Sequence, residues 1–185
     1  MVDDGLLLRK TLGCLVRSDR APIAPQELPV IAALEALGIP FERYGHPPLA
    51  SAADAAPYWA DIDAAHTKNL FLRNQKGTRH YLVIIELLKR ADLRAVANQV
   101  GDGKLSFGSP EQLQALLGVT PGSVSPFGLV HDSSREVQVC IDRDLKIHER
   151  ISFHPNINTA TLVLTFADFE RFLASRGNAT QFITV

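Results

Sequence analysis

Long apolar runs are missing from this sequence. Among its 185 residues the longest unbroken apolar stretches are only a few residues, such as 82–85. About 20 consecutive apolar residues are needed to cross a bilayer, so we expect no transmembrane helix and no membrane partner. The first four residues include Asp3 and Asp4, where a secretory signal carries basic residues. These features predict a cytoplasmic protein.

Cysteine is also scarce. The two cysteines, Cys14 and Cys140, lie far apart, with no CxxC pair and no Cys/His cluster at zinc spacing. This excludes a disulfide scaffold and gives no indication of a structural zinc site. We expect small buried thiols in a reducing compartment.

Several common catalytic motifs are absent. The sequence has no GxGxxG, no P-loop, no GxSxG elbow and no HExxH. Their absence argues against the commonest nucleotide-binding enzymes, serine hydrolases and zinc proteases.

Positive and negative charges nearly balance over the whole chain, which has a net charge of −1, but they are unevenly distributed. Residues 68–104 carry eight bases and three acids, a net charge of +5, whereas 1–67 carry −4 and 105–185 carry −2. The basic residues of this middle segment are Lys68, Arg73, Lys76, Arg79, Lys89, Arg90, Arg94 and Lys104. They indicate either a phosphate-facing surface or an ordinary solvated hairpin and helix. One basic face on a neutral protein suits a transient RNA substrate.

The chain has the length of one domain with a small appendage. We expect an N-terminal extension over residues 1–25, which ends in a proline-bounded linker, and a single domain over 26–185. Strands and helices interleave irregularly and the loops are short. This pattern predicts an α+β (mixed α/β) fold with a mainly antiparallel sheet flanked by helices.

Periodicity and turn residues place the elements. Helices are predicted at 27–37, 92–100, 109–118 and 168–175, and strands at 41–44, 68–73, 80–85, 105–107, 136–141, 151–153, 159–165 and 181–185. The strand at 80–85 is apolar on both faces in its second half, so it should be central in the sheet. Ser51 with Asp54 resembles the start of a further helix.

Lys68 and Asn69 stand at the start of a strand. Lys68 either marks the rim of the sheet or presents a point charge to a phosphate or a reacting carbonyl. Neighbouring strand residues point to opposite faces, so a shared site for Lys68 and Asn69 requires a bulge or irregular geometry.

A stiff loop follows at 122–126, Gly-Ser-Val-Ser-Pro. Gly122 permits a positive φ or close backbone approach, and Pro126 fixes the exit of the loop. The backbone N–H groups around Ser123 and Val124 are suited to bind an oxyanion or a carbonyl. An ordinary turn is the alternative.

His154 lies at the end of a predicted strand, before a proline and two asparagines. The loop at 153–161 is rich in hydrogen-bond donors and acceptors, although a lone histidine is often structural. The other histidines, His46, His66, His80, His131 and His148, show no comparable neighbourhood, and no metal is assigned.

Together these motifs resemble one family. The segments 67–72, 104–107, 122–129 and 153–161 occur in the order found in YbaK-like, prolyl-tRNA-synthetase-associated editing domains. The likeness is greatest to the free-standing ProXp-ala (PrdX-like) branch, which hydrolyses alanine from tRNA(Pro), and it covers roughly residues 28–175. The resemblance implies a partly barrel-like β-sheet flanked by helices.

The resemblance also implies roles for individual residues. The family's strand lysine and neighbouring asparagine fall on Lys68 and Asn69, its Gly-x-x-x-Pro loop on Gly122 to Pro126, and its motif histidine on His154. Catalysis would then rest on Lys68 and His154, without a metal or other cofactor and with help from the terminal ribose hydroxyl of the tRNA. The implied partners are aminoacyl-tRNA and prolyl-tRNA synthetase. We expect no DNA partner, because the sequence shows no helix-turn-helix and no basic arm.

One segment departs from the family. Relatives have Pro-x-Phe-Thr-x-Glu-Glu where this chain has small residues over 48–54. That segment shapes the amino-acid pocket in the family, so smaller side chains would enlarge it. The sequence therefore predicts a deacylase for Ala-tRNA(Pro) and leaves alternatives: another substrate such as Cys-tRNA(Pro), Ser-tRNA or Thr-tRNA, a non-catalytic module that binds tRNA or the synthetase, or a small-ligand binding domain.

Overall fold

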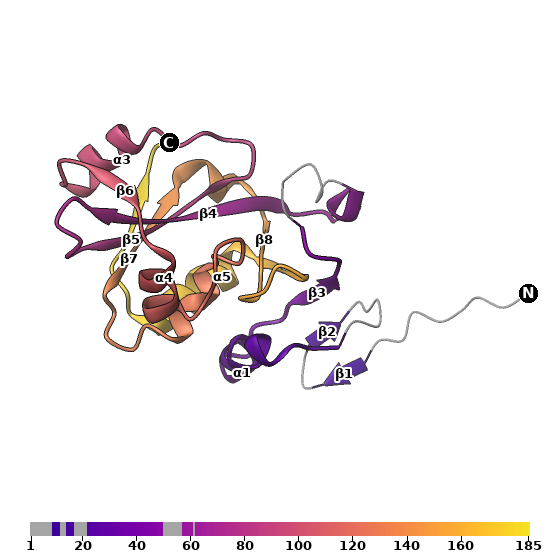
Figure 1. Ribbon diagram of the computed structural model, residues 1–185. Helices are drawn as coiled ribbons and strands as arrows, with labels where there is room; N and C mark the ends of the chain where they lie inside the picture. The colour runs from indigo at the N-terminus through magenta and orange to yellow at the C-terminus, as the bar shows by residue number, and fades with distance from the viewer. Residues whose placement is uncertain (1–8, 12–13, 17–21, 50–56, 61) are drawn as a thin grey trace, which may run out of the picture.

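The computed structural model describes residues 9–11, 14–16, 22–49, 57–60 and 62–185 (Figure 1). Its strands are β1 (Arg9–Thr11), β2 (Cys14–Val16), β3 (Glu42–Gly45), β4 (Ala65–Asn74), β5 (His80–Glu86), β6 (Leu105–Phe107), β7 (Val137–Asp142), β8 (Arg150–Phe153), β9 (Ala160–Thr165) and β10 (Thr180–Ile183). Its α-helices are α1 (Leu28–Ala36), α3 (Leu93–Val100), α4 (Pro110–Leu117) and α5 (Phe166–Arg176). Short 3₁₀ turns are η1 (Pro25–Glu27), η2 (Pro126–Val130) and η3 (Arg143–Ile147).

The strands join in one mixed sheet in the order β1-β2-β3-β9-β8-β4-β5-β7-β10, with β6 on β4. Antiparallel pairs are β1–β2, β3–β9, β9–β8, β4–β5 and β4–β6. Parallel pairs are β2–β3, β8–β4, β5–β7 and β7–β10. The predicted α+β class is confirmed, and β5 is central, with β4 and β7 on its two sides.

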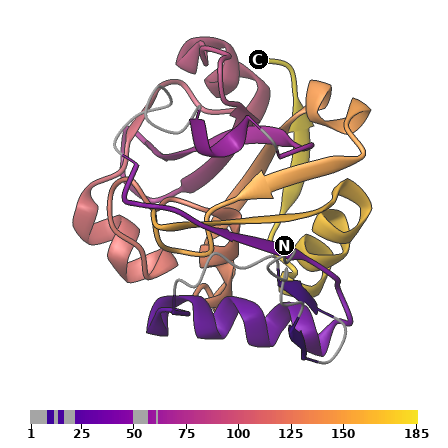
Figure 2. The same cartoon turned by 90° about the vertical axis from the view of Figure 1, so that its right-hand side faces the viewer.

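Two apolar clusters lie on opposite faces of the central strands. The larger contains β-strand side chains such as Phe71 and Ile84, covered by α1, α4 and α5. The smaller contains Leu72 and Ile85 under α3. Figure 2 shows α1 and α3 at opposite ends of the molecule, with α4 and α5 to either side between them. Alternate residues of β4 and β5 therefore face different cores.

The helix ends follow local capping rules. Ser109 caps α4 in a reciprocal pair with Gln112, and the helix ends at Gly118 with φ +66°. Asp92 caps α3. Helix α5 begins two residues earlier than predicted, because Thr165 is its cap and Asp168 lies inside its first turn.

The first residues described add to one edge of the sheet. Strand β2 pairs with β3 through Leu15 and Glu42. The domain boundary at residue 25 stays a prediction, and the helix start predicted at Ser51 and Asp54 lies outside the described residues. Cys140 is a buried thiol, as expected, and burial raises its pKa to about 11. No helix in the described ranges is long and apolar enough to span a membrane.

Candidate active site

The candidate site lies where β4 and β8 separate. These parallel strands pair only through Ala65–Ile151 and His66–Ser152. Farther along the same edge of β4, β6 pairs only with residues 72–74. No described strand pairs with residues 67–71 on this edge. Gaps between diverging parallel strands, at their carboxyl ends, are common ligand positions in open sheets.

The 122–126 loop fills part of this gap. Asn69 donates a hydrogen bond from Nδ2 to the backbone oxygen of Val124, at 3.0 Å. Gly122 has φ +89°, a conformation that favours glycine. Ser123 and Pro126 are buried, and Pro126 is the first residue of η2. The part of the loop that leads into η2 is therefore held in place. The structure therefore joins Asn69 to the Gly-x-x-x-Pro loop, two motifs that lie about 55 residues apart.

The asparagine-rich loop after β8 approaches the same place. A Cβ atom built on Gly122 would lie 4.0 Å from Asn158 Nδ2. Asn156 is buried with φ +64°, and neither polar atom of its amide has a hydrogen-bond partner in the described part of the chain. The Oδ1 atom of Asn69 is likewise buried and unpaired there. Buried amides without partners leave hydrogen-bonding capacity for a ligand.

Lys68 and Asn69 point to opposite faces of the sheet. The ladder between β4 and β5 is regular, with Lys68 opposite Ile85 and Asn69 opposite Ile84. The bulge that would bring both side chains to one face is absent from this ladder. Burial, with a smaller effect from the charge of Arg90, lowers the pKa of Lys68.

His154 lies on the Lys68 side of the gap. Its Nδ1 is 2.9 Å from the Ala160 carbonyl oxygen, which can only accept, so Nδ1 carries the proton. Burial lowers the pKa of His154, with a further decrease from His46, and the Ala160 carbonyl opposes this in part. The ring is therefore neutral near pH 7, and Nε2 can accept a proton or a hydrogen bond.

Five aromatic rings form a continuous band around His154. Successive ring centroids lie 6.2 Å apart from Tyr58 to His46, 5.8 Å from His46 to His154, 6.3 Å from His154 to Trp59 and 4.6 Å from Trp59 to His66. Trp59 and His66 are stacked, with 10° between their planes. We call these five residues the aromatic band.

The band corrects the expectation for two histidines. His46 and His66 were expected to have no neighbourhood comparable to that of His154, and this was wrong. His46 directly follows β3, and His66 is the second residue of β4. Only the tertiary fold brings them near His154. Alternation along β4 placed His66 on the same face as Lys68, which was the one indication available in the sequence.

One hydroxyl group holds the band together. The indole N–H of Trp59 donates to Thr161 Oγ1 at 3.2 Å, and His46 Nε2 lies 3.0 Å from the same oxygen. His46 Nδ1 faces the Pro47 carbonyl at 2.9 Å, so it carries the proton and Nε2 accepts from Thr161. At the other end, His66 Nδ1 lies 2.8 Å from Ser152 Oγ.

The predicted basic surface is smaller than the sequence suggested. Lys89 contacts Asp142 and Asp144 at 2.6 and 2.5 Å, and Arg79 contacts Asp102 at 3.4 Å. These cations are neutralised within the fold. Arg90 is exposed and forms no ion pair with any described residue.

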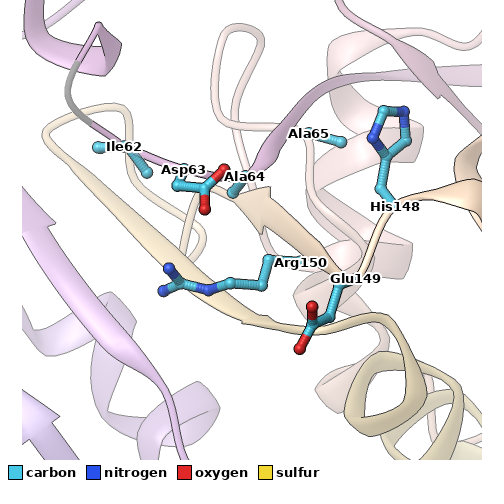
Figure 3. A pocket seen from close by; sticks show the side chains of 7 residues that line it. All are labelled: Ile62, Asp63, Ala64, Ala65, His148, Glu149 and Arg150. Atoms are coloured by element: carbon cyan, nitrogen blue, oxygen red, sulfur yellow. The ribbon is translucent and has the colours of Figure 1, made fainter.

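A separate cavity of about 340 Å³ opens where β4 and β8 begin (Figure 3). Asp63 and Arg150 lie across it from one another, and Arg150 also contacts Glu42 at 2.9 Å. None of the predicted site residues lines it. The lining residues are Ile62, Asp63, Ala64, Ala65, His148, Glu149 and Arg150. With two carboxylates and a paired arginine, this cavity does not suit a phosphate.

No set of three metal-binding side chains occurs within the described ranges. The polar groups at the gap are a lysine, a neutral histidine, backbone groups and asparagine amides. Such groups position a polar substrate and stabilise charge as it develops on an oxygen.

Comparison with known proteins identifies the family of this chain. The aminoacyl-tRNA editing domain model matches residues 46–172. The prolyl-tRNA editing protein ProX of Acetoanaerobium sticklandii is 37% identical over 154 residues, which cover 83% of this chain and 94% of that protein. The prolyl-tRNA synthetase associated domain-containing protein 1 of Bos taurus is 32% identical over 149 residues, 78% of this chain and 86% of that protein.

A solved structure shares the fold. It is described as a candidate trans-editing enzyme for prolyl tRNA synthetase, has a TM-score of 0.69 and 24% identity, and the alignment covers 89% of this chain and 99% of that one. The chain belongs to the aminoacyl-tRNA editing domain family. Within that class it is an aminoacyl-tRNA deacylase of the group that edits mischarged tRNA in trans.

Proposed function

We propose that this protein hydrolyses Ala-tRNA(Pro) to alanine and tRNA(Pro). The observation that carries the proposal is the hydrogen bond that joins Asn69 to the 122–126 loop at the gap between β4 and β8. It occurs in a chain 37% identical to a prolyl-tRNA editing protein. Prolyl-tRNA synthetase is then the enzyme whose errors the protein corrects.

The reaction needs a water, an activated ester and groups that hold them. The water oxygen attacks the ester carbonyl, and the bond to the ribose oxygen breaks. One water proton goes to the ribose oxygen and alanine leaves as the acid. Because the ester is already activated, the protein need not supply a nucleophile.

Three parts of the site have distinct tasks. Lys68 anchors the terminal phosphate or ribose. Backbone groups of Gly122 to Pro126 bind the amino acid and its carbonyl. His154, neutral and with Nε2 unprotonated, orients the ribose hydroxyl or the attacking water.

Size explains why a second site is needed. Alanine is smaller than proline, so a synthetase pocket built for proline cannot strongly exclude it. A pocket that admits alanine and rejects proline by size removes the error. Selectivity for alanine then depends on the walls of the pocket and not on its catalytic groups.

The test is single-turnover deacylation of purified Ala-tRNA(Pro), with Pro-tRNA(Pro), Cys-tRNA(Pro), Ser-tRNA and Thr-tRNA as comparisons. We expect fast loss of alanine and sparing of proline. Faster hydrolysis of the cysteine, serine or threonine ester would identify that ester as the substrate in place of Ala-tRNA(Pro). Stability of all five esters would refute hydrolysis and favour a binding module.

A further inference from the structure

We propose that Trp59 and Arg90 form a subsite for the 3′-terminal nucleotide of the RNA, the base stacking on the indole and the phosphate lying between Arg90 and Lys68. The inference rests on the proposed function, since it names the part of the site that binds the nucleotide. Neither Trp59 nor Arg90 belongs to the motifs that carried the family resemblance.

Trp59 is a fixed and partly exposed ring. One contact is the stack on His66, at 4.6 Å, and another is the indole hydrogen bond to Thr161 at 3.2 Å. The ring is only half-buried, so part of it stays open to solvent. An aromatic side chain held in one orientation is suited to stack on a nucleobase, because little conformational freedom remains to be lost.

The position of Trp59 matches the covalent structure of the substrate. Its ring centroid lies 6.3 Å from that of His154. In an aminoacyl-tRNA the ester is attached to the ribose of the terminal nucleotide, so its base must lie within a few ångströms of the reacting carbonyl. A base on Trp59 therefore leaves the ester within reach of His154.

Arg90 reaches the same end of β4. The backbone N–H of Leu87 donates to the His66 carbonyl at 2.9 Å, so the turn after β5 runs beside the stacked pair. Arg90 follows in this turn, exposed and without an ion pair among the described residues. Of the nearby charged groups, Glu86 is held by His148 at 2.8 Å and Lys89 by Asp142 at 2.6 Å.

Lys68 and Arg90 thus present two positive charges together. Their proximity is also evident in the pKa of Lys68, which burial lowers first and the charge of Arg90 lowers further. The two cations repel one another, and a bound phosphate would relieve that repulsion. A stacking ring beside a pair of cations is the usual arrangement for a single-stranded RNA end.

The experiment uses the intrinsic fluorescence of Trp59, the only tryptophan in the chain. An RNA oligonucleotide that ends in CCA-3′ and carries no amino acid is titrated into the full-length protein. We expect quenching that saturates, and a smaller effect with an oligonucleotide whose last nucleotide lacks its base. No change in emission, at RNA concentrations that inhibit deacylation, would overturn the stacking.

Variants separate the two contributions. Arg90→Glu should weaken RNA binding about tenfold. The slope of binding affinity against salt concentration should decrease by the equivalent of about one phosphate contact. Lys76→Glu is the matched control, because Lys76 is exposed in the hairpin turn between β4 and β5, at the far end of β4. Equal weakening by both variants would mean a general charge effect and would refute the role of Arg90.

A second readout covers the case in which replacing Trp59 disturbs the fold. Trp59→Phe keeps a ring and Trp59→Ala removes it. We expect Trp59→Ala to raise the KM for aminoacyl-tRNA about 5- to 150-fold, with partial rescue by phenylalanine. Unchanged KM in Trp59→Ala would overturn the subsite and leave the deacylase intact. Quenching without hydrolysis of any ester would refute the proposed function and keep the subsite.

Discussion

At the residue scale, the site depends on strand alternation. Lys68 and Asn69 are neighbours that face different sides of the sheet, and each has its own surroundings. Asn69 is bound to the 122–126 loop, whereas Lys68 lies beside Arg90. The two tasks proposed for the site, positioning of the amino acid and anchoring of the phosphate, therefore fall on different faces of one strand.

Lys68→Ala should reduce deacylation about 10²- to 10³-fold, the usual loss for one charged group that stabilises a transition state. Lys68 is only half-buried, so the fold should be retained. The measurement is single-turnover hydrolysis of Ala-tRNA(Pro), with circular dichroism to verify folding. Lys76→Ala, in the exposed hairpin turn, is the control. Activity within twofold of wild type would remove Lys68 from the mechanism.

The lowered pKa of His154 predicts an effect of pH on stability. An unfolded histidine takes up its proton near pH 6.5 and the folded His154 at lower pH, so the unfolded chain binds more protons in between. The contribution of His154 to the free energy of unfolding should therefore be fully present above pH 6.5 and decrease as the pH falls below that value. His66 and His80, whose pKa values are also lowered mainly by burial, add to the same trend.

His154→Gln tests this prediction by urea denaturation at pH 7.5 and 5.5. The variant should lose less stability on acidification than the wild type, by at most about 1.4 kcal/mol, because pH 5.5 lies one unit below the pKa of an unfolded histidine. His131→Gln, at an exposed position, is the control. An identical acid loss in His154→Gln and wild type would contradict the assignment.

At the element scale, the 122–126 loop is supported by packing of η2 against α4. A Cβ atom on Gly128 would lie 2.8 Å from the Leu117 Cβ and 2.9 Å from its carbonyl oxygen. These are backbone and near-backbone atoms that cannot rotate away. The close approach of η2 therefore requires glycine at this position.

Gly128→Ala should lower the free energy of unfolding by about 1–3 kcal/mol, because the added methyl group forces η2 and α4 apart. Since η2 follows the 122–126 loop directly, deacylation should also slow. Gly103→Ala is a suitable comparison, since nothing lies within 4 Å of its added Cβ. Chemical denaturation would detect the difference, and equal stability of the two variants would show that η2 shifts freely.

At the scale of the whole molecule, a buried ion pair connects the N-terminal helix to the sheet. Glu27 accepts two hydrogen bonds from the Arg43 guanidinium, at 2.7 and 2.9 Å. Their side chains are 0% and 3% exposed. Charges in such a position are stable only when they are paired.

Glu27→Ala should destabilise the protein by about 3–5 kcal/mol, because it leaves the Arg43 charge buried without this carboxylate. Asp168→Ala, which removes a partner of the more exposed Arg171, should cost less, about 1 kcal/mol from the ion pair and from the hydrogen bond that Thr165 Oγ1 donates to the Asp168 carboxylate. Thermal denaturation would measure both. A smaller loss for Glu27→Ala than for Asp168→Ala would mean that water reaches Arg43.

Much of the fold was predictable because its causes are local. The α4 boundaries follow from Ser109, Pro110 and Gly118, and the central position of β5 follows from its apolar faces. The parallel pairings were not predictable, since they join strands far apart in the chain. The same holds for the pairing of β8 with β4. This pairing stops after two residue pairs, and the gap beyond it forms the candidate site.

The sequence by itself determined the element types and the mixed class, because capping, periodicity and turn chemistry act over a few residues. The resemblance to a family of editing domains singled out Lys68, Asn69, Gly122 and His154 as candidate site residues. Only the tertiary structure decided that His46 and Trp59 lie beside His154, with His66 stacked on Trp59. It also decided that Lys89 and Arg79 are paired with carboxylates, whereas Arg90 has no ion pair with a described residue. Those outcomes depend on contacts between segments distant in sequence. Strand order and register set such contacts, and no local pattern encodes them.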